Sequence, residues 1–175
     1  HDLGHWEECQ LGPFRIVATP ADHTGPLPAE INLIIECGDD FRIFFGGDAR
    51  WSPAFGQIAE RFPHIDLALL PVGGTLIFGK RTTLSPRDAL RVCEVLKPRW
   101  ALPIHEGGEW LPVPPASWHP GRTLDFELEV QNADCMTVPV RVPRGAVTEF
   151  ARLYEVPRRV RSLAGFSPSP GSVPL

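Results

Sequence analysis

The sequence predicts an α/β protein in which helices flank a mixed β-sheet. Short apolar runs are bounded by glycine, proline and aspartate, as β-strands usually are. Two other segments repeat apolar residues at helical spacing behind a Ser-Pro start signal. Strands and helices alternate in the second part of the chain, which is typical of parallel strands whose faces are covered by helices.

The first strands follow one another without a helix between them. Residues 13–19 and 31–37 are strand-like, and the turn-rich segment 20–29 separates them. A Gly-Asp-Asp turn at 38–40 leads back into a third strand at 41–45. We therefore expect three consecutive strands before the first helix.

Helices and strands then alternate. Ser52-Pro53 starts a helix whose apolar stripe runs to residue 62, and residues 66–71 form a short buried strand. Ser85-Pro86 opens a second helix, which Lys97-Pro98 ends. A strand at 100–104 follows, so the predicted order is β-β-β-α-β-α-β.

The C-terminal part is less regular. Residues 112–120 are expected to be an irregular connection, 123–130 an ambiguous helix, and 137–142 an edge strand, because Pro139 cannot donate to a ladder. We assign residues 1–150 to the folded domain. Residues 151–175 are a C-terminal extension, disordered from about residue 165, where the composition is rich in serine and proline.

Composition limits the classes of function. A chain of 175 residues fits one domain, and a net charge of −4 with an isoelectric point near 5.9 argues against a nucleic-acid partner. No run reaches the ~18–20 apolar residues of a transmembrane segment. Four widely spaced cysteines fit reduced, mostly buried thiols in a cytoplasmic protein.

Three strand ends each present one metal-type donor. They are His23 after Thr-Pro-Ala-Asp, Asp48 after Phe-Gly-Gly, and His105 after Leu-Pro-Ile. Parallel strands bring their C-terminal ends to one edge of the sheet, where ligands collect in α/β proteins. Two imidazoles and a carboxylate suit zinc or a similar divalent ion. The adjacent Asp22 is at best a weak candidate to orient His23.

Other features have simpler interpretations. His1 and His5 have the spacing of a zincin motif, but that motif needs a helix that a terminal glycine does not support. His64 and His119 lie beside prolines in predicted surface turns and are expected to be solvated. The Gly-Gly pairs at 46–47 and 73–74 are expected to provide backbone clearance rather than a phosphate cradle.

In their order and spacing, six motifs together resemble the C-terminal half of a metallo-β-lactamase-fold hydrolase. The similarity is to the branch with L-ascorbate-6-phosphate lactonase-like enzymes and N-acylphosphatidylethanolamine-hydrolysing phospholipase D. The motifs are Trp6-Glu7-Glu8-Cys9, Pro20-Ala21-Asp22-His23, Phe45-Gly46-Gly47-Asp48, residues 66–71, Ser85-Pro86-Arg87-Asp88-Ala89 and Leu102-Pro103-Ile104-His105-Glu106-Gly107.

The resemblance implies an αββα sandwich, of which this chain supplies the C-terminal half. It implies that His23 completes a first metal site, that Asp48 bridges two metals and is catalytic, and that His105 is the last ligand of the second. The metals would be two Zn²⁺ ions, with Mn²⁺ possible. The family's His-x-His-x-Asp-His motif, which supplies four further ligands, does not occur in this sequence.

The implied function is hydrolysis of an ester, lactone or phosphodiester bond by metal-activated water, on a small-molecule or lipid-like substrate that Trp110 could help to line. The alternative is a catalytically incomplete remnant that acts as a binding or assembly module through an uncovered apolar sheet face. In either case we expect a partner, which is the missing N-terminal half or a second copy of the chain.

Overall fold

The computed structural model describes residues 2–23, 30–38, 41–107, 117–143 and 145–148. The chain divides into two compact units, His1–Arg141 and Val142–Leu175, and the helices and strands of the described residues all lie in the first. Trp110, the predicted domain boundary at residue 150 and the predicted disorder from residue 165 lie outside the described residues.

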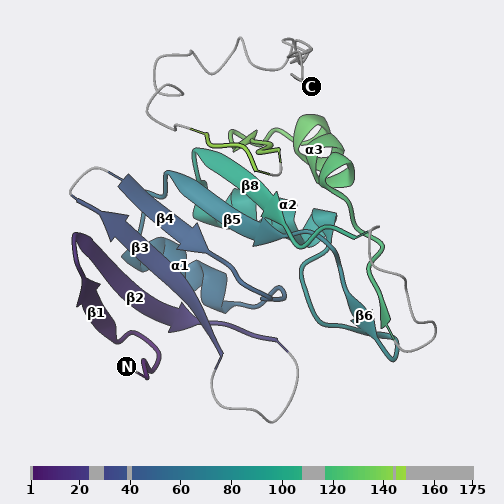
Figure 1. Cartoon of the computed structure of the whole chain (residues 1–175). Coiled ribbons are helices and arrows are strands. Elements are labelled where there is room, and N and C mark those ends of the chain that lie inside the picture. Colours follow the sequence, from purple (N-terminus) through teal and green to yellow (C-terminus); the bar gives the residue numbers. More distant parts are fainter. Residues whose placement is uncertain (1, 24–29, 39–40, 108–116, 144, 149–175) are drawn as a thin grey trace, which may run out of the picture. The chain divides into compact units, whose positions relative to one another are not determined.

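The main sheet has seven strands in the order β1-β2-β3-β4-β5-β8-β10. The first four strands form an antiparallel meander, whereas β5, β8 and β10 continue the sheet in parallel from β4. The sheet is therefore mixed, as predicted (Figure 1). The strands are β1 (Glu8–Leu11), β2 (Phe14–Pro20), β3 (Ile31–Cys37), β4 (Phe41–Phe45), β5 (Leu67–Pro71), β8 (Trp100–Ile104) and β10 (Val138–Pro139).

A smaller sheet has the order β7-β6-β9 and was not predicted. Its strands are β6 (Leu76–Ile77), β7 (Lys80–Arg81) and β9 (Ser117–Trp118). Each is two residues long, so none has an alternation of apolar and polar residues that sequence reading could detect. The strand β1 was missed for a similar reason, because its sequence Glu-Cys-Gln-Leu is mostly polar.

Helices α1 (Ala54–Arg61) and α2 (Pro86–Leu96) lie on one face of the main sheet (Figure 1). One side chain from each of five neighbouring strands points to this face, and all five belong to the same buried cluster as Phe55 and Leu90 of the helices. Helix α3 (Thr123–Asn132), which the sequence left ambiguous, adds Phe126 to this cluster. The five strand residues are Val17, Ile34, Phe44, Ala68 and Ala101.

Helix α2 begins as its sequence predicts. The Ser85 hydroxyl accepts a hydrogen bond from the Asp88 amide, and the Asp88 carboxylate accepts one from the Ser85 amide, which is a capping box. Lys97 ends the helix in the left-handed conformation before Pro98. At the start of α1, the Ser52 hydroxyl accepts a hydrogen bond from the Ala54 amide at 3.3 Å, but the residue at the N-cap position is Pro53.

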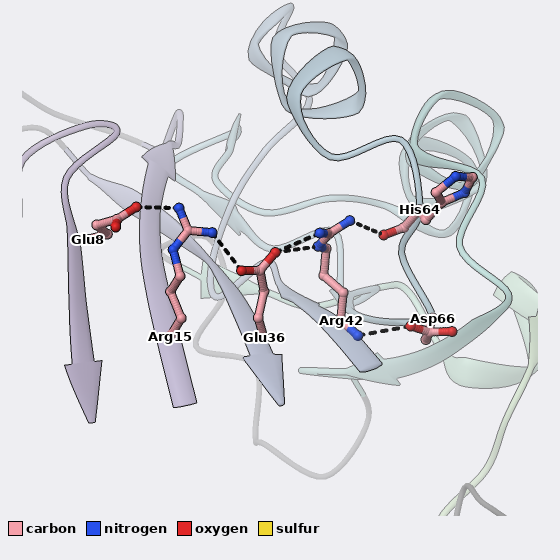
Figure 2. Close-up of polar contacts among 6 residues, drawn as sticks. All are labelled: Glu8, Arg15, Glu36, Arg42, His64 and Asp66. Carbon is pink, nitrogen blue, oxygen red and sulfur yellow. Dashed lines mark hydrogen bonds and ion pairs between the residues drawn. The ribbon is translucent and has the colours of Figure 1, made fainter. Parts of the chain in front are cut away.

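A row of charges crosses the strands at one end of this same face. The Arg15 guanidinium joins Glu8 and Glu36, and the Arg42 guanidinium binds Glu36 from the other side at 2.6 and 2.9 Å (Figure 2). The Arg42 amide also donates to the Asp66 carboxylate at 2.9 Å. Because Glu36 is held by two arginines, the row fixes the register of β2, β3 and β4 at this end.

The opposite face of the main sheet is apolar and half-buried. Register pairs place Ile16, Ile35 and Ile43 in one row, which continues into the buried Leu67 and Trp100, and Leu33, Phe45, Leu69 and Leu102 in the next row. The other seven side chains of these two rows are of intermediate exposure. The expected apolar face is therefore present, although its side chains are half-buried rather than fully open to solvent.

The edge strand β10 and the cysteines were both subjects of sequence-based predictions. Pro139 does lie in the edge strand β10, where Val138 and Val140 donate to β8 or its flank at 3.0 and 2.8 Å and no donor is needed between them. All four cysteines are free, but only Cys93 is buried, so the expectation of mostly buried thiols is wrong for the other three.

In the described part of the chain, no helix combines the length and apolar character that crossing a bilayer requires.

Candidate metal centre

Asp48 follows the C-terminal end of β4 through two glycines that have different roles. Gly46 donates its amide to the Leu69 carbonyl at 2.9 Å, and a β-carbon at this position would lie 3.1 Å from the same oxygen. Gly47 adopts a positive φ of 47°, which reverses the chain. The turn leaves the Asp48 side chain 58% exposed at the edge of the sheet.

His105 follows the C-terminal end of β8 in a conformation that is unusual for its residue type. Its φ is +50°, in the left-handed region that costs an L-residue roughly 1–2 kcal/mol. Neighbouring hydrogen bonds hold the chain there, from Val72 to the Ile104 carbonyl at 3.0 Å and from Gly107 to the Gly121 carbonyl at 2.7 Å. Strain of this kind that the surroundings maintain is characteristic of functional positions.

Three glycines make room for the His105 loop. A β-carbon on Gly73 would lie 2.3 Å from the His105 carbonyl oxygen, and one on Gly107 would lie 1.8 Å from the His119 carbonyl oxygen. A β-carbon on Gly121 would lie 1.9 Å from the Val72 carbonyl oxygen. The predicted clearance role is therefore confirmed for Gly73, and Gly107 and Gly121 extend it.

Asp48 and His105 meet. The His105 Nδ1 lies 2.7 Å from the Asp48 Oδ1, although the two residues are far apart in the sequence. A carboxylate oxygen only accepts, so Nδ1 carries the proton in this contact. The prediction that these two strand ends converge is confirmed.

His23 is oriented by a backbone carbonyl. Its Nδ1 lies 2.6 Å from the Thr82 oxygen, which can only accept, so Nδ1 carries a proton and the neutral ring keeps its lone pair on Nε2. Thr82 is itself fixed, since its amide and hydroxyl both donate to the Thr75 carbonyl, at 2.8 and 3.3 Å. A ring anchored in this way is the usual arrangement of a metal-binding histidine.

The three donors do not form one complete group. Within the described ranges, no cluster of three or more His, Cys, Asp or Glu side chains is arranged to hold a metal. Asp48 and His105 form a pair, and His23 stands beside Thr82. The donor chemistry fits a divalent ion, and the joint ligand role of the three residues stays a prediction.

Neighbouring residues differ from the sequence-based expectations. Asp22 does not orient His23, because its carboxylate pairs with Arg50 at 2.9 Å. His119 is half-buried rather than solvated, with ring nitrogens 2.9 Å from the Thr75 hydroxyl and 3.2 Å from the Ser117 hydroxyl. His64 is exposed, as predicted. His119 was missed because Thr75 lies 44 residues away, where no local pattern signals the contact.

Comparison with known proteins identifies the family. The family model described as "Beta-lactamase superfamily domain" matches residues 1–105. The chain belongs to this superfamily. The narrower placement in the branch with lactonase-like and phospholipase D-like enzymes stays a prediction.

Curated relatives include a UPF0173 protein of Pyrococcus abyssi, 31% identical over 102 residues, which are 58% of this chain and 42% of the relative. A UPF0173 metal-dependent hydrolase of Nitratidesulfovibrio vulgaris is 31% identical over 106 residues, 61% of this chain and 41% of the relative. The chain thus spans less than half the length of these relatives.

Solved structures support the fold. The metallo hydrolase Igni18 of Ignicoccus hospitalis superposes with a TM-score of 0.62 at 20% identity, over 80% of this chain and 56% of that one. A putative Zn-dependent hydrolase of the metallo-β-lactamase superfamily from Thermotoga maritima superposes with a TM-score of 0.54 at 22% identity, over 75% of this chain and 59% of that one. The mixed sheet and its helices therefore form part of a metallo-β-lactamase fold.

Proposed function

We propose that this chain supplies part of the metal centre of a metal-dependent hydrolase. The observation that carries the proposal is the 2.7 Å contact between Asp48 and His105, two side chains delivered by the ends of β4 and β8. Superfamily membership and the name of the Nitratidesulfovibrio vulgaris relative support it.

Asp48, His105 and His23 are the proposed ligands, and Asp48 is the proposed bridging and catalytic carboxylate. The proposed ions are two Zn²⁺, with Mn²⁺ as the alternative, since both accept nitrogen and oxygen ligands. When bound, such ions acidify a water molecule and polarise the bond under attack. The proposed substrates carry an ester, lactone or phosphodiester bond and are small or lipid-like, and the proposed setting is cytoplasmic.

The chain's own residues have defined tasks in this scheme. The 2.7 Å contact holds the Asp48 carboxylate and the His105 imidazole side by side, where a bound ion would take the place of the proton between Oδ1 and Nδ1. The Thr82 carbonyl holds the Nδ1 proton of His23, so that the neutral ring presents Nε2 to an ion. The left-handed backbone of His105 is packed against Gly73, and this conformation sets the direction in which the imidazole side chain leaves the backbone. The ligands of the His-x-His-x-Asp-His motif would come from an N-terminal half.

The test is a zinc titration of the chain, alone and supplied with the N-terminal half of a UPF0173 relative. Asp48→Asn and His105→Gln should each weaken zinc binding by at least about 100-fold, while the exposed His64→Gln serves as the matched control. Hydrolysis of an aryl ester, a lactone and bis(p-nitrophenyl) phosphate then identifies the bond type. Unchanged zinc affinity in both site variants, or no zinc and no turnover in the supplemented protein, contradicts the proposal.

A second candidate is a binding or assembly module. The half-buried apolar face of β2, β3, β4, β5 and β8 favours it. Leu33→Glu and Phe45→Glu would place charges on this face without touching Asp48 or His105. If the module function is correct, sedimentation will show that these variants lose self-association or binding of the N-terminal half. If the wild-type chain is a metal-free monomer at all concentrations and does not bind the N-terminal half, the module function is contradicted.

A further inference from the structure

A pocket of about 670 Å³ opens beside the candidate metal centre, and charged side chains line most of it. Two of its residues, Asp22 and Arg50, neighbour His23 and Asp48 in the sequence, and Arg81 precedes the Thr82 that anchors His23. The lining residues within the described part of the chain are Asp22, Arg50, Trp51, Lys80, Arg81, Asp88 and Arg91.

Among the described residues that line this pocket, positive charge exceeds negative charge. Asp22 pairs with Arg50 at 2.9 Å, and Asp88 approaches Arg91 at 3.7 Å while its other oxygen serves the capping box of α2. Those four charges balance. Lys80 makes no ion pair with any described residue, and Arg81 donates to the uncharged Gly74 carbonyl at 3.0 Å. Two cations therefore remain without a counter-charge among the described lining residues.

Hydrogen bonds tie the pocket walls to the loops of the candidate metal centre. The Arg50 amide donates to the Asp22 carbonyl at 2.8 Å, and the Leu84 amide donates to the Ala49 carbonyl at 2.9 Å. Asp48 and Arg50 are two residues apart, so their Cα atoms lie within about 7 Å of each other. A ligand held in the pocket therefore lies beside the metal-site loops.

The positions of Lys80 and Arg81 are built into the local fold. They form β7, which pairs with β6 across a two-residue turn, Phe78-Gly79, with positive φ angles of 46° and 78°. Gly74 lets the Arg81 guanidinium lie against the backbone, because a β-carbon there would be 2.5 Å from the guanidinium Nη1. Arg81 still has donors to spare, since a guanidinium carries five N–H groups.

We propose that this pocket binds a dianionic phosphate monoester group of the ligand, held by Lys80 and Arg81. A phosphate monoester carries nearly two negative charges at neutral pH, which matches the two uncompensated cations. Arginine binds phosphate through paired N–H groups, and lysine adds a compact charge. Trp51, which stacks on Phe55 and lies under Arg91, is the aromatic residue among the described lining residues.

This inference extends the proposed function by assigning a substrate feature, and phosphate binding can be measured without turnover. The probe is phenyl phosphate, titrated by calorimetry into the whole chain after chelator treatment, at constant ionic strength. Lys80→Ala and Arg81→Ala should each raise the dissociation constant about tenfold or more. Lys80→Arg should keep most of the affinity. Arg87→Ala removes an exposed charge outside the pocket and should change nothing.

The outcomes separate the two proposals. Asp48→Asn with His105→Gln should abolish zinc binding and leave phenyl phosphate binding intact. Phosphate binding by the wild type, with no zinc binding even when the N-terminal half is supplied, supports the pocket and defeats the hydrolase. Zinc binding without phosphate binding defeats the pocket alone. The pocket assignment is also overturned if Arg87→Ala weakens binding as much as Lys80→Ala does, or if benzoate, a monoanion, binds as tightly as phenyl phosphate. Circular dichroism verifies the fold of each variant.

Discussion

Gly73→Ala tests whether the backbone approach behind His105 is as close as the structure shows. The new β-carbon would lie 2.3 Å from the His105 carbonyl oxygen, whereas real contacts of this type stay above 3.0 Å. The two segments must therefore separate by at least 0.7 Å, the difference between these distances. Neither partner can rotate away, because the obstructing atom belongs to the backbone.

The cost depends on the contacts that this movement breaks. The adjacent hydrogen bond from Val72 to the Ile104 carbonyl is 3.0 Å long, and adding 0.7 Å takes it beyond hydrogen-bond distance. Its loss costs about 1 kcal/mol, and overpacking adds about 1–3 kcal/mol. Alanine returns about 0.4–1 kcal/mol by restricting the unfolded chain. The expected net loss in the free energy of unfolding is about 2 kcal/mol.

Urea unfolding of the whole chain measures this loss, and Gly56→Ala is the matched control. Gly56 lies inside α1, and a β-carbon there would meet nothing within 4 Å. The same substitution should therefore stabilise the protein by about 0.5–1 kcal/mol at that position. If Gly73→Ala also stabilises the protein, or leaves its stability unchanged, the close approach of the Gly73 and His105 backbones is refuted.

Two further predictions concern titration and reactivity. Burial opposes ionisation of Glu36, but hydrogen bonds from Arg15 and Arg42 outweigh it and lower the pKa of the Glu36 carboxyl. The contribution of Glu36 to the free energy of unfolding is therefore complete above pH about 4.3, the value of a free glutamate, and is lost as the pH falls through the lowered pKa. Acid unfolding followed by fluorescence should show that the stability of Glu36→Gln depends less on pH in this range than that of the wild type. Identical pH profiles of the two proteins would argue against the arginine contacts. Burial raises the pKa of the Cys93 thiol, so Ellman's reagent should label it only on unfolding. Cys93→Ala should leave the number of fast-reacting thiols unchanged, and a decrease would show that Cys93 is accessible.

The fold was largely predictable because its main elements carry their own signals. The Ser85-Pro86 start, the Lys97-Pro98 stop and the apolar residues of β5 and β8 are local features, and each lies where it was expected. The small sheet was not predictable, since β6, β7 and β9 have only two residues each and depend on pairing across the chain. Helix α3 was ambiguous because its polar and apolar residues do not separate into faces, as exposed Leu124 and Leu128 show.

The site was predictable only in part. Strand-end position and residue type pointed to Asp48 and His105, and the structure joins them. The Thr82 carbonyl that orients His23 was not predictable, because any residue can supply a backbone oxygen. The ion pair of Asp22 with Arg50 was likewise hidden, since it depends on how two loops meet. Contacts between side chains from separate loops leave no periodic trace in the sequence.

The magnitudes indicate what holds His105 in place. Its contact with Asp48 joins side chains that are 48% and 58% exposed, and such a surface pair contributes about 0–1 kcal/mol. The left-handed backbone at His105 costs roughly 1–2 kcal/mol, so the contact alone does not maintain it. The difference must come from the backbone packing around Gly73, Gly107 and Gly121 and its hydrogen bonds. Asp48→Asn should therefore leave the His105 loop folded, whereas Gly73→Ala should displace it even with Asp48 intact.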